Sequence, residues 1–251
     1  YSVASLTDSY GFLPDDYEII QQVFEKWDSV ITNNPIFGKI EISILIDDLP
    51  TGTLGWAAPT YGYNANGDGT NYSFGSIFVT RGEISLNQSY IRSMKNTIKS
   101  DGKTSYYYTL LHEVGHILGI GTFWEFYNDN NSPIVNYTDD NGNSKKYYNG
   151  VNALREMKTY FNNNDFVGIP VEDDGGSGTA GGHPEEGFVT GVSSNNRYIN
   201  GILHPGLNDE LMTGWSESGT TLMPLSRITI GFLEDIGYGV NYDNADAYSV
   251  M

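Results

Sequence analysis

The sequence of 251 residues contains no cysteine. Disulfide bonds, thiolate metal ligands and a thiol nucleophile are therefore excluded from this stretch of chain. No long uninterrupted apolar run occurs either, so the sequence predicts no transmembrane helix. The first residue is Tyr1 rather than Met, and we expect a processed or trimmed chain whose signal or pro-segment lies outside this sequence.

Basic residues are few: 13 lysines and arginines stand against 31 aspartates and glutamates, which gives a net charge of −18. This charge repels nucleic acid and anionic membranes, so neither is an expected partner. Calcium is a secondary candidate, because residues 64–69 and 139–143 carry oxygen side chains at alternating positions. Neither run has the acid that closes an EF-hand loop, so polar turns are the favoured interpretation.

Histidine is also scarce, and two of the four histidines lie in the segment TLLHEVGHILGIG, residues 109–121. On a helix, His112 and His116 share a face, so both imidazoles can bind one metal ion. Glu113 is rotated by one residue and can reach a water on that metal without binding the metal itself. This H-E-x-x-H arrangement is typical of zinc peptidases, in which the glutamate is the general base.

The opposite side of this helix is apolar and predicts an anchor in the core. Its apolar residues are Leu110, Leu111, Val114, Ile117 and Leu118. Two histidines on a helix can also be an ordinary polar surface. Three titratable groups within an apolar segment need a partner, however, which favours the metal site. Gly119 and Gly121 can adopt the positive φ that ends a helix, so the chain is expected to turn beneath the metal.

The rest of the sequence mixes helical and extended patterns and predicts an α+β fold. Apolar spacing indicates helices at residues 14–31, 89–99, 151–161 and 224–236. Alternating or short apolar runs indicate strands at residues 39–46, 54–58, 76–80 and 83–86, of which 54–58 is expected at a sheet edge. Polar or glycine-rich composition predicts loops at residues 64–75, 128–149 and 172–186.

A catalytic zinc site normally has three protein ligands and a water. The compact form of the motif would place its third histidine at the position that Thr122 occupies. Glu156, in a later predicted helix, is a distant alternative. The remaining histidines are His183, in the glycine-rich stretch GTAGGHPEE, and His204, close before Met212. From the residues alone, both histidines stay open as the third ligand.

Taken in order, HEVGHILGIG, a long insertion, GGSGTAGGH and ELMTG resemble the leishmanolysin family of metzincin zinc peptidases. With the final stretch PLSRITIGFLEDIGYGVNY, the resemblance covers most of the chain after about residue 50. It implies that His112, His116 and His183 bind zinc. It also implies that Glu113 is the general base and that Met212 forms a methionine turn beneath the metal.

Two features depart from the family's pattern. Pro184 follows His183, where an aromatic residue is common in the family. The spacing from His183 to Met212 is also longer, and an insertion is predicted at residues 189–201. His204 therefore remains a rival ligand, although the match to GTAGGH favours His183.

The resemblance further implies a metzincin-type zincin fold, with one catalytic domain over residues 1–251. Residues 1–121 are expected to hold a twisted mixed sheet with helices packed above an active-site cleft. Residues 122–251 are expected to form a largely irregular subdomain with the third ligand, the methionine turn and a final helix. LGWAAPTYG looks like the family's edge strand, so an extended substrate is expected along Leu54, Gly55, Trp56 and Ala57.

We therefore expect a secreted, monomeric zinc endopeptidase that hydrolyses proteins or peptides. Thr213, Gly214 and Trp215 are expected to wall the pocket for the side chain after the cleaved bond. One alternative is a non-catalytic secreted binding or adhesion module that keeps zinc for structure, although such a site has no use for Glu113. A weaker alternative is another zinc hydrolase, such as an amidase that acts on cell walls.

Overall fold

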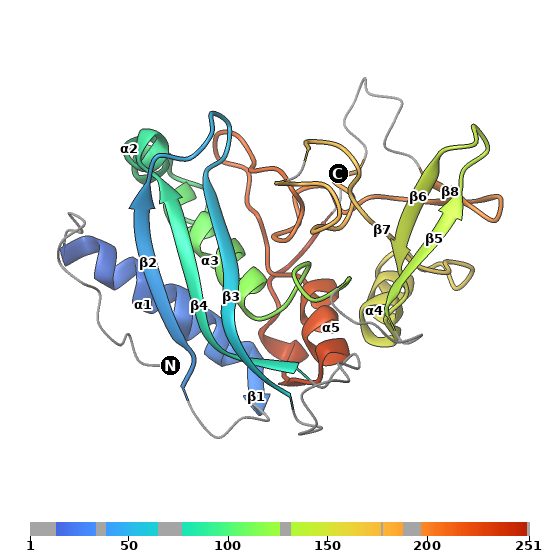
Figure 1. Ribbon diagram of the computed structural model, residues 1–251, viewed down its shortest axis with the longest axis horizontal. Coiled ribbons are helices and arrows are strands. Elements are labelled where there is room, and N and C mark those ends of the chain that lie inside the picture. The colour runs from blue at the N-terminus through green and yellow to red at the C-terminus, as the bar shows by residue number, and fades with distance from the viewer. Residues whose placement is uncertain are drawn as a thin grey trace.

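The computed structural model describes residues 14–33, 39–64, 77–125, 132–176, 178–187 and 197–249 (Figure 1). Most of the loop predicted at residues 64–75 and most of the insertion predicted at 189–201 lie outside these residues. The calcium candidates between residues 65 and 69 lie outside them as well.

A three-stranded mixed sheet forms the first half of the fold (Figure 1). Its order is β2-β4-β3, with β2 at Glu41–Asp47, β3 at Gly55–Asn64 and β4 at Ile77–Asn87. β2 runs parallel to β4 and β3 runs antiparallel to it, so β3 is an edge strand as predicted. Isoleucine stands at every second position of β2, which puts the isoleucines on one face of the strand, against the core.

β4 is one continuous strand, so the prediction of two strands at residues 76–80 and 83–86 was wrong. Arg81 and Gly82 lie between those two predicted strands. In the fold, a side chain at Gly82 would come within 2.4 Å of Ile117. The glycine therefore allows α3 to pack closely against the sheet rather than interrupting the strand.

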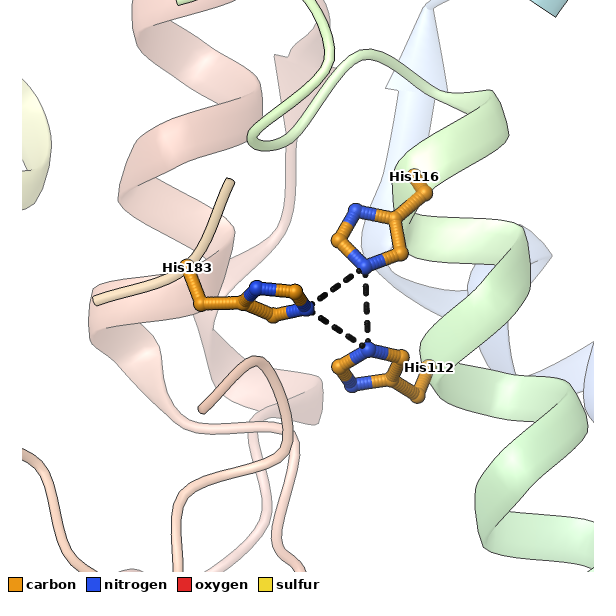
Figure 2. A group of neighbouring side chains, drawn as sticks. All are labelled: His112, His116 and His183. Carbon is orange, nitrogen blue, oxygen red and sulfur yellow. Dashed lines mark hydrogen bonds between the residues drawn. The ribbon is translucent and has the colours of Figure 1, made fainter. Parts of the chain in front are cut away.

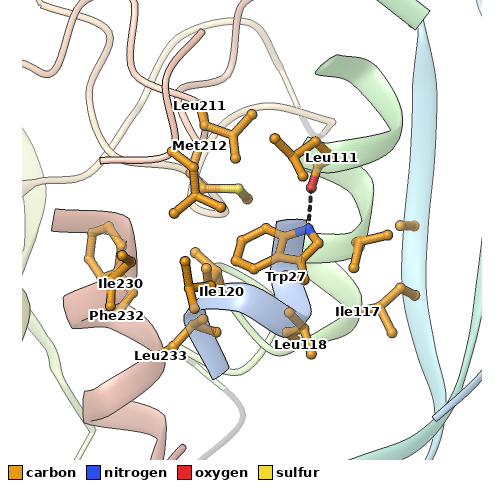
Figure 3. Packing of buried hydrophobic residues seen from close by; sticks show 14 of the residues in the cluster. Trp27, Leu111, Ile117, Leu118, Ile120, Leu211, Met212, Ile230, Phe232 and Leu233 are labelled. Atoms are coloured by element: carbon orange, nitrogen blue, oxygen red, sulfur yellow. Dashed lines mark hydrogen bonds between the residues drawn. The ribbon is translucent and has the colours of Figure 1, made fainter. Parts of the chain in front are cut away.

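Three helices accompany this sheet: α1 at Pro14–Val30, α2 at Gln88–Asn96 and α3 at Ser105–Ile117. α3 lies against β3 and β4, and α1 packs against α3. The indole nitrogen of Trp27 on α1 donates a hydrogen bond to the Leu111 carbonyl at 3.1 Å, and Trp27 is fully buried (Figure 3). The predicted helices at residues 14–31 and 89–99 are confirmed with small shifts of their ends.

A β-hairpin opens the second half, so the prediction of a loop at residues 128–149 was wrong for residues 134–148, while residues 128–131 lie outside the described ones. β5 at Ile134–Thr138 pairs antiparallel with β6 at Ser144–Tyr148, and β6 pairs with β7 at Ile169–Pro170. The Asp139 carboxylate accepts hydrogen bonds from the amides of Asn141 and Asn143. Residues 139–143 are thus the polar turn of a hairpin, as favoured over a calcium loop.

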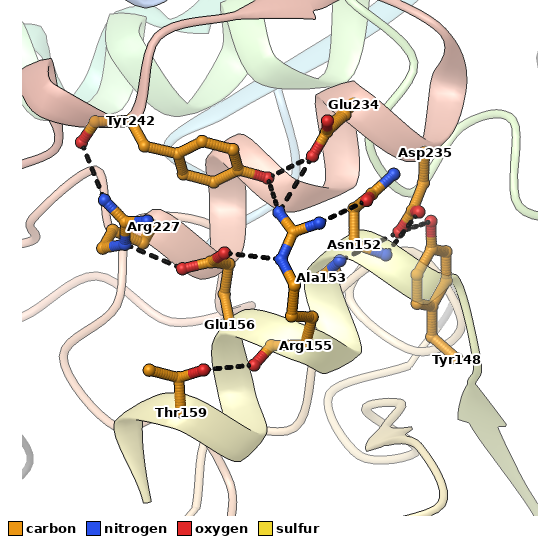
Figure 4. Close-up of polar contacts among 10 residues, drawn as sticks. All are labelled: Tyr148, Asn152, Ala153, Arg155, Glu156, Thr159, Arg227, Glu234, Asp235 and Tyr242. Carbon is orange, nitrogen blue, oxygen red and sulfur yellow. Dashed lines mark hydrogen bonds and ion pairs between the residues drawn. The ribbon is translucent and has the colours of Figure 1, made fainter.

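Two helices pack together beside this hairpin: α4 at Val151–Tyr160 and α5 at Arg227–Ile236. The Asp235 carboxylate on α5 accepts hydrogen bonds from the amides of Asn152 and Ala153 at the start of α4 (Figure 4). Ser226 caps α5, and Gly237 ends it with a φ of 110°. The helix predicted from residue 224 therefore begins three residues later.

The remaining elements are short. β1 at Ile31–Asn33 pairs with β10 at Gly239–Val240, β8 at Arg197–Ile199 pairs with β9 at Ile202–His204, and a 3-10 turn, η2, covers Tyr242–Asn244. Residues 172–176 and 178–187 contain no helix or strand beyond an isolated bridge between Val171 and Pro184. Among the described residues, no helix is long and apolar enough to cross a bilayer. The predicted α+β class is confirmed.

Candidate metal centre

The helix that carries H-E-x-x-H ends as its glycines predict. The amide of Gly119 donates to the His116 carbonyl and the amide of Ile120 donates to the Gly115 carbonyl, both at 3.1 Å. These two bonds form a Schellman motif, which requires the positive φ of 112° at Gly119. The Thr122 hydroxyl donates to the same His116 carbonyl at 2.7 Å. Thr122, at the position of the compact motif's third histidine, therefore helps to close the helix end.

Three imidazoles meet beside this helix end (Figure 2). The Nε2 atom of His116 lies 2.9 Å from Nε2 of His112 and 3.0 Å from Nε2 of His183, and the third Nε2–Nε2 distance is 3.3 Å. His183 thus joins the pair from the opposite side, 67 residues after His116. The structure brings together the three histidines that the resemblance named.

The opposite ring nitrogen of each histidine contacts a backbone carbonyl. Nδ1 of His112 lies 2.7 Å from the Leu211 oxygen, and Nδ1 of His116 lies 2.9 Å from the Ile120 oxygen. Nδ1 of His183 lies 2.7 Å from the Thr179 oxygen. A carbonyl only accepts, so each Nδ1 carries the proton and each Nε2 is left with a lone pair. Three lone pairs that converge on one point repel one another unless a cation lies between them.

Burial keeps these imidazoles neutral. It lowers the pKa of His112 and lowers the pKa of His116 well below its usual value. Burial, together with the nearby His112, lowers the pKa of His183 to about 3. Neutral imidazole is the form that binds metal, so burial holds the three side chains in the state that metal binding requires.

The segment that carries His183 is fixed by a close backbone contact. A side chain at Gly121 would come within 1.8 Å of the Gly182 carbonyl oxygen. The turn after α3 therefore touches the chain directly before the third histidine. The amide of Glu172 also donates to the His183 carbonyl at 3.0 Å. Pro184, which departs from the family's pattern, lies in the bridge with Val171 and leaves His183 in place.

Glu113 is buried between α3 and the edge strand. A side chain at Gly55 of β3 would come within 2.6 Å of its Oε1 atom, so only glycine leaves room there for the carboxylate. Burial raises the pKa of Glu113 to about 8. Its position on α3 is next to His112, as the motif requires of a general base that does not bind the metal.

Met212, which the resemblance assigns to a methionine turn, packs against α3. It is fully buried, and its sulfur is so close to α3 that a side chain at Gly115 would come within 2.5 Å of it. Trp27 contacts the same glycine from α1, so Met212, Trp27 and α3 pack as one unit (Figure 3). Glycine at the fourth position of HEVGH thus allows this close packing.

Glu210 holds the backbone at Met212, and no sequence motif predicted this role. Its buried carboxylate accepts hydrogen bonds from the Met212 amide at 2.7 Å, the Ser226 hydroxyl at 2.6 Å and the Thr229 hydroxyl at 2.5 Å. Burial raises the pKa of Glu210, and these hydrogen bonds oppose that change. The only sequence signal was its position directly before Leu211-Met212.

His204 and Glu156, the alternative third ligands, contact other residues. Nε2 of His204 accepts a hydrogen bond from the Val167 amide at 3.0 Å, and its ring packs against Phe166. Glu156 pairs with Arg155 and Arg227 beside α5 (Figure 4). Neither side chain belongs to the histidine cluster.

The residues expected to bind substrate lie near Glu113 on the edge strand. Gly55 contacts Glu113, Trp56 is 50% exposed, and Ala57 is buried. Leu54 directly precedes β3 and packs partly buried against the core. After Met212, the chain continues through buried Thr213 and partly buried Gly214 to Trp215, which is 50% exposed.

The donor set fits zinc. Zinc prefers nitrogen ligands at about 2.0–2.1 Å, and tetrahedral ligands at that distance lie about 3.3 Å apart. The three Nε2 atoms are 2.9–3.3 Å apart, each oriented through a carbonyl on its second nitrogen. His112, His116 and His183 could therefore hold the ion, with Glu113 beside it.

Comparison with known proteins supports this chemistry. The leishmanolysin peptidase family model matches residues 80–249, which is more than half of the chain and includes α3, His183 and Met212. No curated protein matches the chain. The chain therefore belongs to the leishmanolysin family of metallopeptidases.

Proposed function

We propose that this protein is a zinc-dependent endopeptidase with His112, His116 and His183 as the metal ligands and Glu113 as the general base. The observation that carries the proposal is the convergence of three Nε2 lone pairs next to a buried carboxylate that is not itself a ligand. When bound, zinc would lower the pKa of a water and polarise the scissile carbonyl.

The chain's own groups supply the remaining steps. The positive charge of a bound metal ion would favour the ionised form of Glu113. Its carboxylate then accepts the proton of the attacking water and delivers it to the nitrogen of the leaving amine. Its place against Gly55 puts this proton transfer beside the edge strand. A substrate added to the outer edge of β3 would pair backbone to backbone along Gly55, Trp56 and Ala57, with Leu54 at the start of the strand. This would bring an extended peptide next to Glu113.

The other parts of the active site follow from the same placement. Met212 supports the histidines from below by packing and does not bind the metal. Thr213, Gly214 and Trp215 wall the pocket for the residue after the cleaved bond. The proposal also includes one catalytic domain over residues 1–251, with subdomains at 1–121 and 122–251 on either side of a metzincin-type cleft. We further propose that the protein is secreted and acts as a monomer.

Glu113→Gln tests the catalytic assignment. Loss of the base should lower kcat for casein hydrolysis by roughly 10²–10⁴-fold. Zinc content, measured by elemental analysis, should stay at that of the native protein, because Glu113 binds no metal in this scheme. Glu125→Gln is the matched control, since Glu125 is an exposed residue paired with Lys146. Native activity in Glu113→Gln would remove Glu113 from the mechanism.

Substrate panels separate the alternatives. An endopeptidase should cleave casein and internal peptide bonds, and chelation of zinc should abolish that cleavage. A non-catalytic binding module would cleave nothing even when loaded with zinc. A cell-wall amidase would release peptide from glycan strands and leave casein intact.

A further inference from the structure

A second cluster of charged side chains lies at the ends of the segment that carries His183. The carboxylates of Glu172, Asp173 and Glu185 place one oxygen each within 4.8 Å of one another. Glu172 and Glu185 are buried. The cluster shares no residue with the three histidines, and the proposed peptide hydrolysis does not use it.

The local positive charges do not balance this cluster. Arg197 donates to Glu185 at 2.6 Å and to Asp173 at 2.5 Å, and Lys145 pairs with Asp173. Two positive groups therefore face three carboxylates. Glu172 is bonded by backbone amides, those of Asp174 and Glu186, which bring no full charge. Among the described residues the carboxylates therefore outnumber the paired cationic side chains by one, and two of the three carboxylates are buried.

Two oxygen atoms at this place lack a hydrogen-bond partner among the described residues. Glu185 has no exposed surface, and its Oε1 atom is unpartnered while Oε2 contacts Arg197. The hydroxyl of Tyr137 is also buried and unpartnered, and Tyr137 lies opposite Lys145 in the hairpin, whose ammonium group pairs with Asp173. Buried polar atoms are nearly always satisfied, so these two oxygens indicate a bound group that completes the cluster.

We propose that Glu172, Asp173 and Glu185 bind a calcium ion. Calcium is a hard cation that takes several oxygen ligands in flexible geometry, and it commonly binds carboxylates and carbonyls. The cluster offers oxygen donors and no nitrogen or sulfur donor, which disfavours zinc at this position. The Oε1 atom of Glu185 becomes a ligand, and the added positive charge offsets the excess of carboxylate.

An ion at this position would help to hold the segment that carries His183 in place. Glu172 and Glu185 stand at the two ends of the glycine-rich segment, and backbone bonds from Glu172 to His183 and from Gly181 to Glu172 tie the segment to them. An ion that joins the two ends closes the segment and reduces the entropy lost when His183 binds its metal. Calcium binding itself is independent of the proposed peptidase activity and can be tested without it.

The test measures calcium binding to the zinc-loaded native protein after calcium is removed with a chelating resin. Titration calorimetry should show one calcium ion per chain. At about 100 times its Kd, calcium should raise Tm by roughly 5–10 °C. Glu185→Gln should abolish both effects while zinc content stays unchanged, and Asp173→Asn should weaken both. Because Asp173 lies at the edge of the cluster, the second variant remains informative if Glu185→Gln does not fold.

Asp174→Asn is the matched control. It removes the same charge from the same segment, but its exposed side chain is outside the cluster. Unchanged calcium binding in this control, together with its loss in Glu185→Gln, would support the site. Absence of binding to the native protein would overturn the proposal and leave a buried water as the partner of Glu185. Equal binding by all variants would also overturn it, because the calcium would then be held by the acidic surface.

Discussion

The two histidines on α3 and the histidine at residue 183 are held by different physical means. Buried apolar side chains surround α3, and the 3.6-residue period of the helix puts His112 and His116 on one face. The segment around His183 has no such period. Backbone hydrogen bonds and buried carboxylates, among them Glu172 and Glu210, hold it and the methionine turn instead.

This contrast predicts how substitutions in the two regions will affect stability. An apolar scaffold loses stability gradually when it is trimmed, because neighbouring side chains still exclude water. A buried polar network fails more sharply, because a lost partner leaves an unsatisfied group in a place of low dielectric. We therefore expect a substitution to lower metal affinity more, the closer it lies to His183, and the following predictions test that expectation.

The largest effect is expected from His183→Ala. It removes a ligand rather than a residue that orients one, so zinc affinity should fall by more than about 100-fold. The three Nε2 atoms form a single cluster, and the two histidines of α3 alone leave it open on one side. Elemental analysis after dialysis, with casein hydrolysis on the same samples, measures this loss.

His204→Ala is the matched control for that variant. It should keep its zinc, because His204 contacts Val167 and Phe166 and not the metal centre. It should still lower the free energy of unfolding by about 1–3 kcal/mol, since the Val167 amide loses its acceptor. Zinc loss in His204→Ala with zinc retained in His183→Ala would reverse the ligand assignment.

The second-largest loss of zinc affinity is expected where the turn after α3 contacts the chain before His183. Gly121→Ala places a methyl group where 1.8 Å separates it from the Gly182 carbonyl oxygen, at a φ of 76°. The chain before His183 must move, so zinc affinity should fall at least about tenfold, a change of about 1.4 kcal/mol. Competition with a chromogenic zinc chelator measures that change.

Gly142→Ala is the control for Gly121→Ala, because it introduces similar backbone strain without displacing His183. Gly142 has a similar φ of 84°, but nothing lies within 4 Å of the added methyl group. This variant should lose about 1–2 kcal/mol of stability and keep its zinc affinity. If both variants bind zinc as the native protein does, the contact at Gly182 does not position His183.

The same contrast explains what the sequence could predict. The helix with His112 and His116 has an apolar period, and Gly119 and Gly121 mark its end, so local rules were sufficient. His183 has no local signal of this kind. It could be preferred over His204 only through the resemblance of GTAGGH to a known family, because the contact between Gly121 and Gly182 joins residues far apart in the sequence.

The errors have equally physical causes. The hairpin of β5 and β6 was missed because Asn and Lys are common in its strands, while Tyr137, Tyr147 and Tyr148 supply its apolar surface. The break expected at Gly82 was really space for Ile117. Glu210 was missed because a buried carboxylate is recognised only by its donors, and Ser226 and Thr229 lie 16 and 19 residues away in the chain.

The smallest effect on the metal centre is expected from Glu210→Gln. This variant tests the polar network directly, through the free energy of unfolding. The new amide group can accept at only one atom, so the Met212 amide or the Ser226 and Thr229 hydroxyls lose their acceptor, at a cost of about 1–3 kcal/mol. Glu125→Gln, on an exposed residue, should change stability by less than about 1 kcal/mol.

The pH dependence of the stability lost in Glu210→Gln provides a further test. Because burial raises the pKa of Glu210 above its usual 4.5, the folded protein binds this proton more tightly than the unfolded chain does. The contribution of Glu210 to stability is therefore full below pH 4.5 and is lost as pH rises through the raised pKa. Glutamine does not titrate, so the stability deficit of Glu210→Gln relative to the native protein should narrow in urea unfolding as pH rises from 4.5 through the raised pKa of Glu210. A deficit that widens over this range would mean that the hydrogen bonds outweigh burial and that the network stabilises the charged carboxylate.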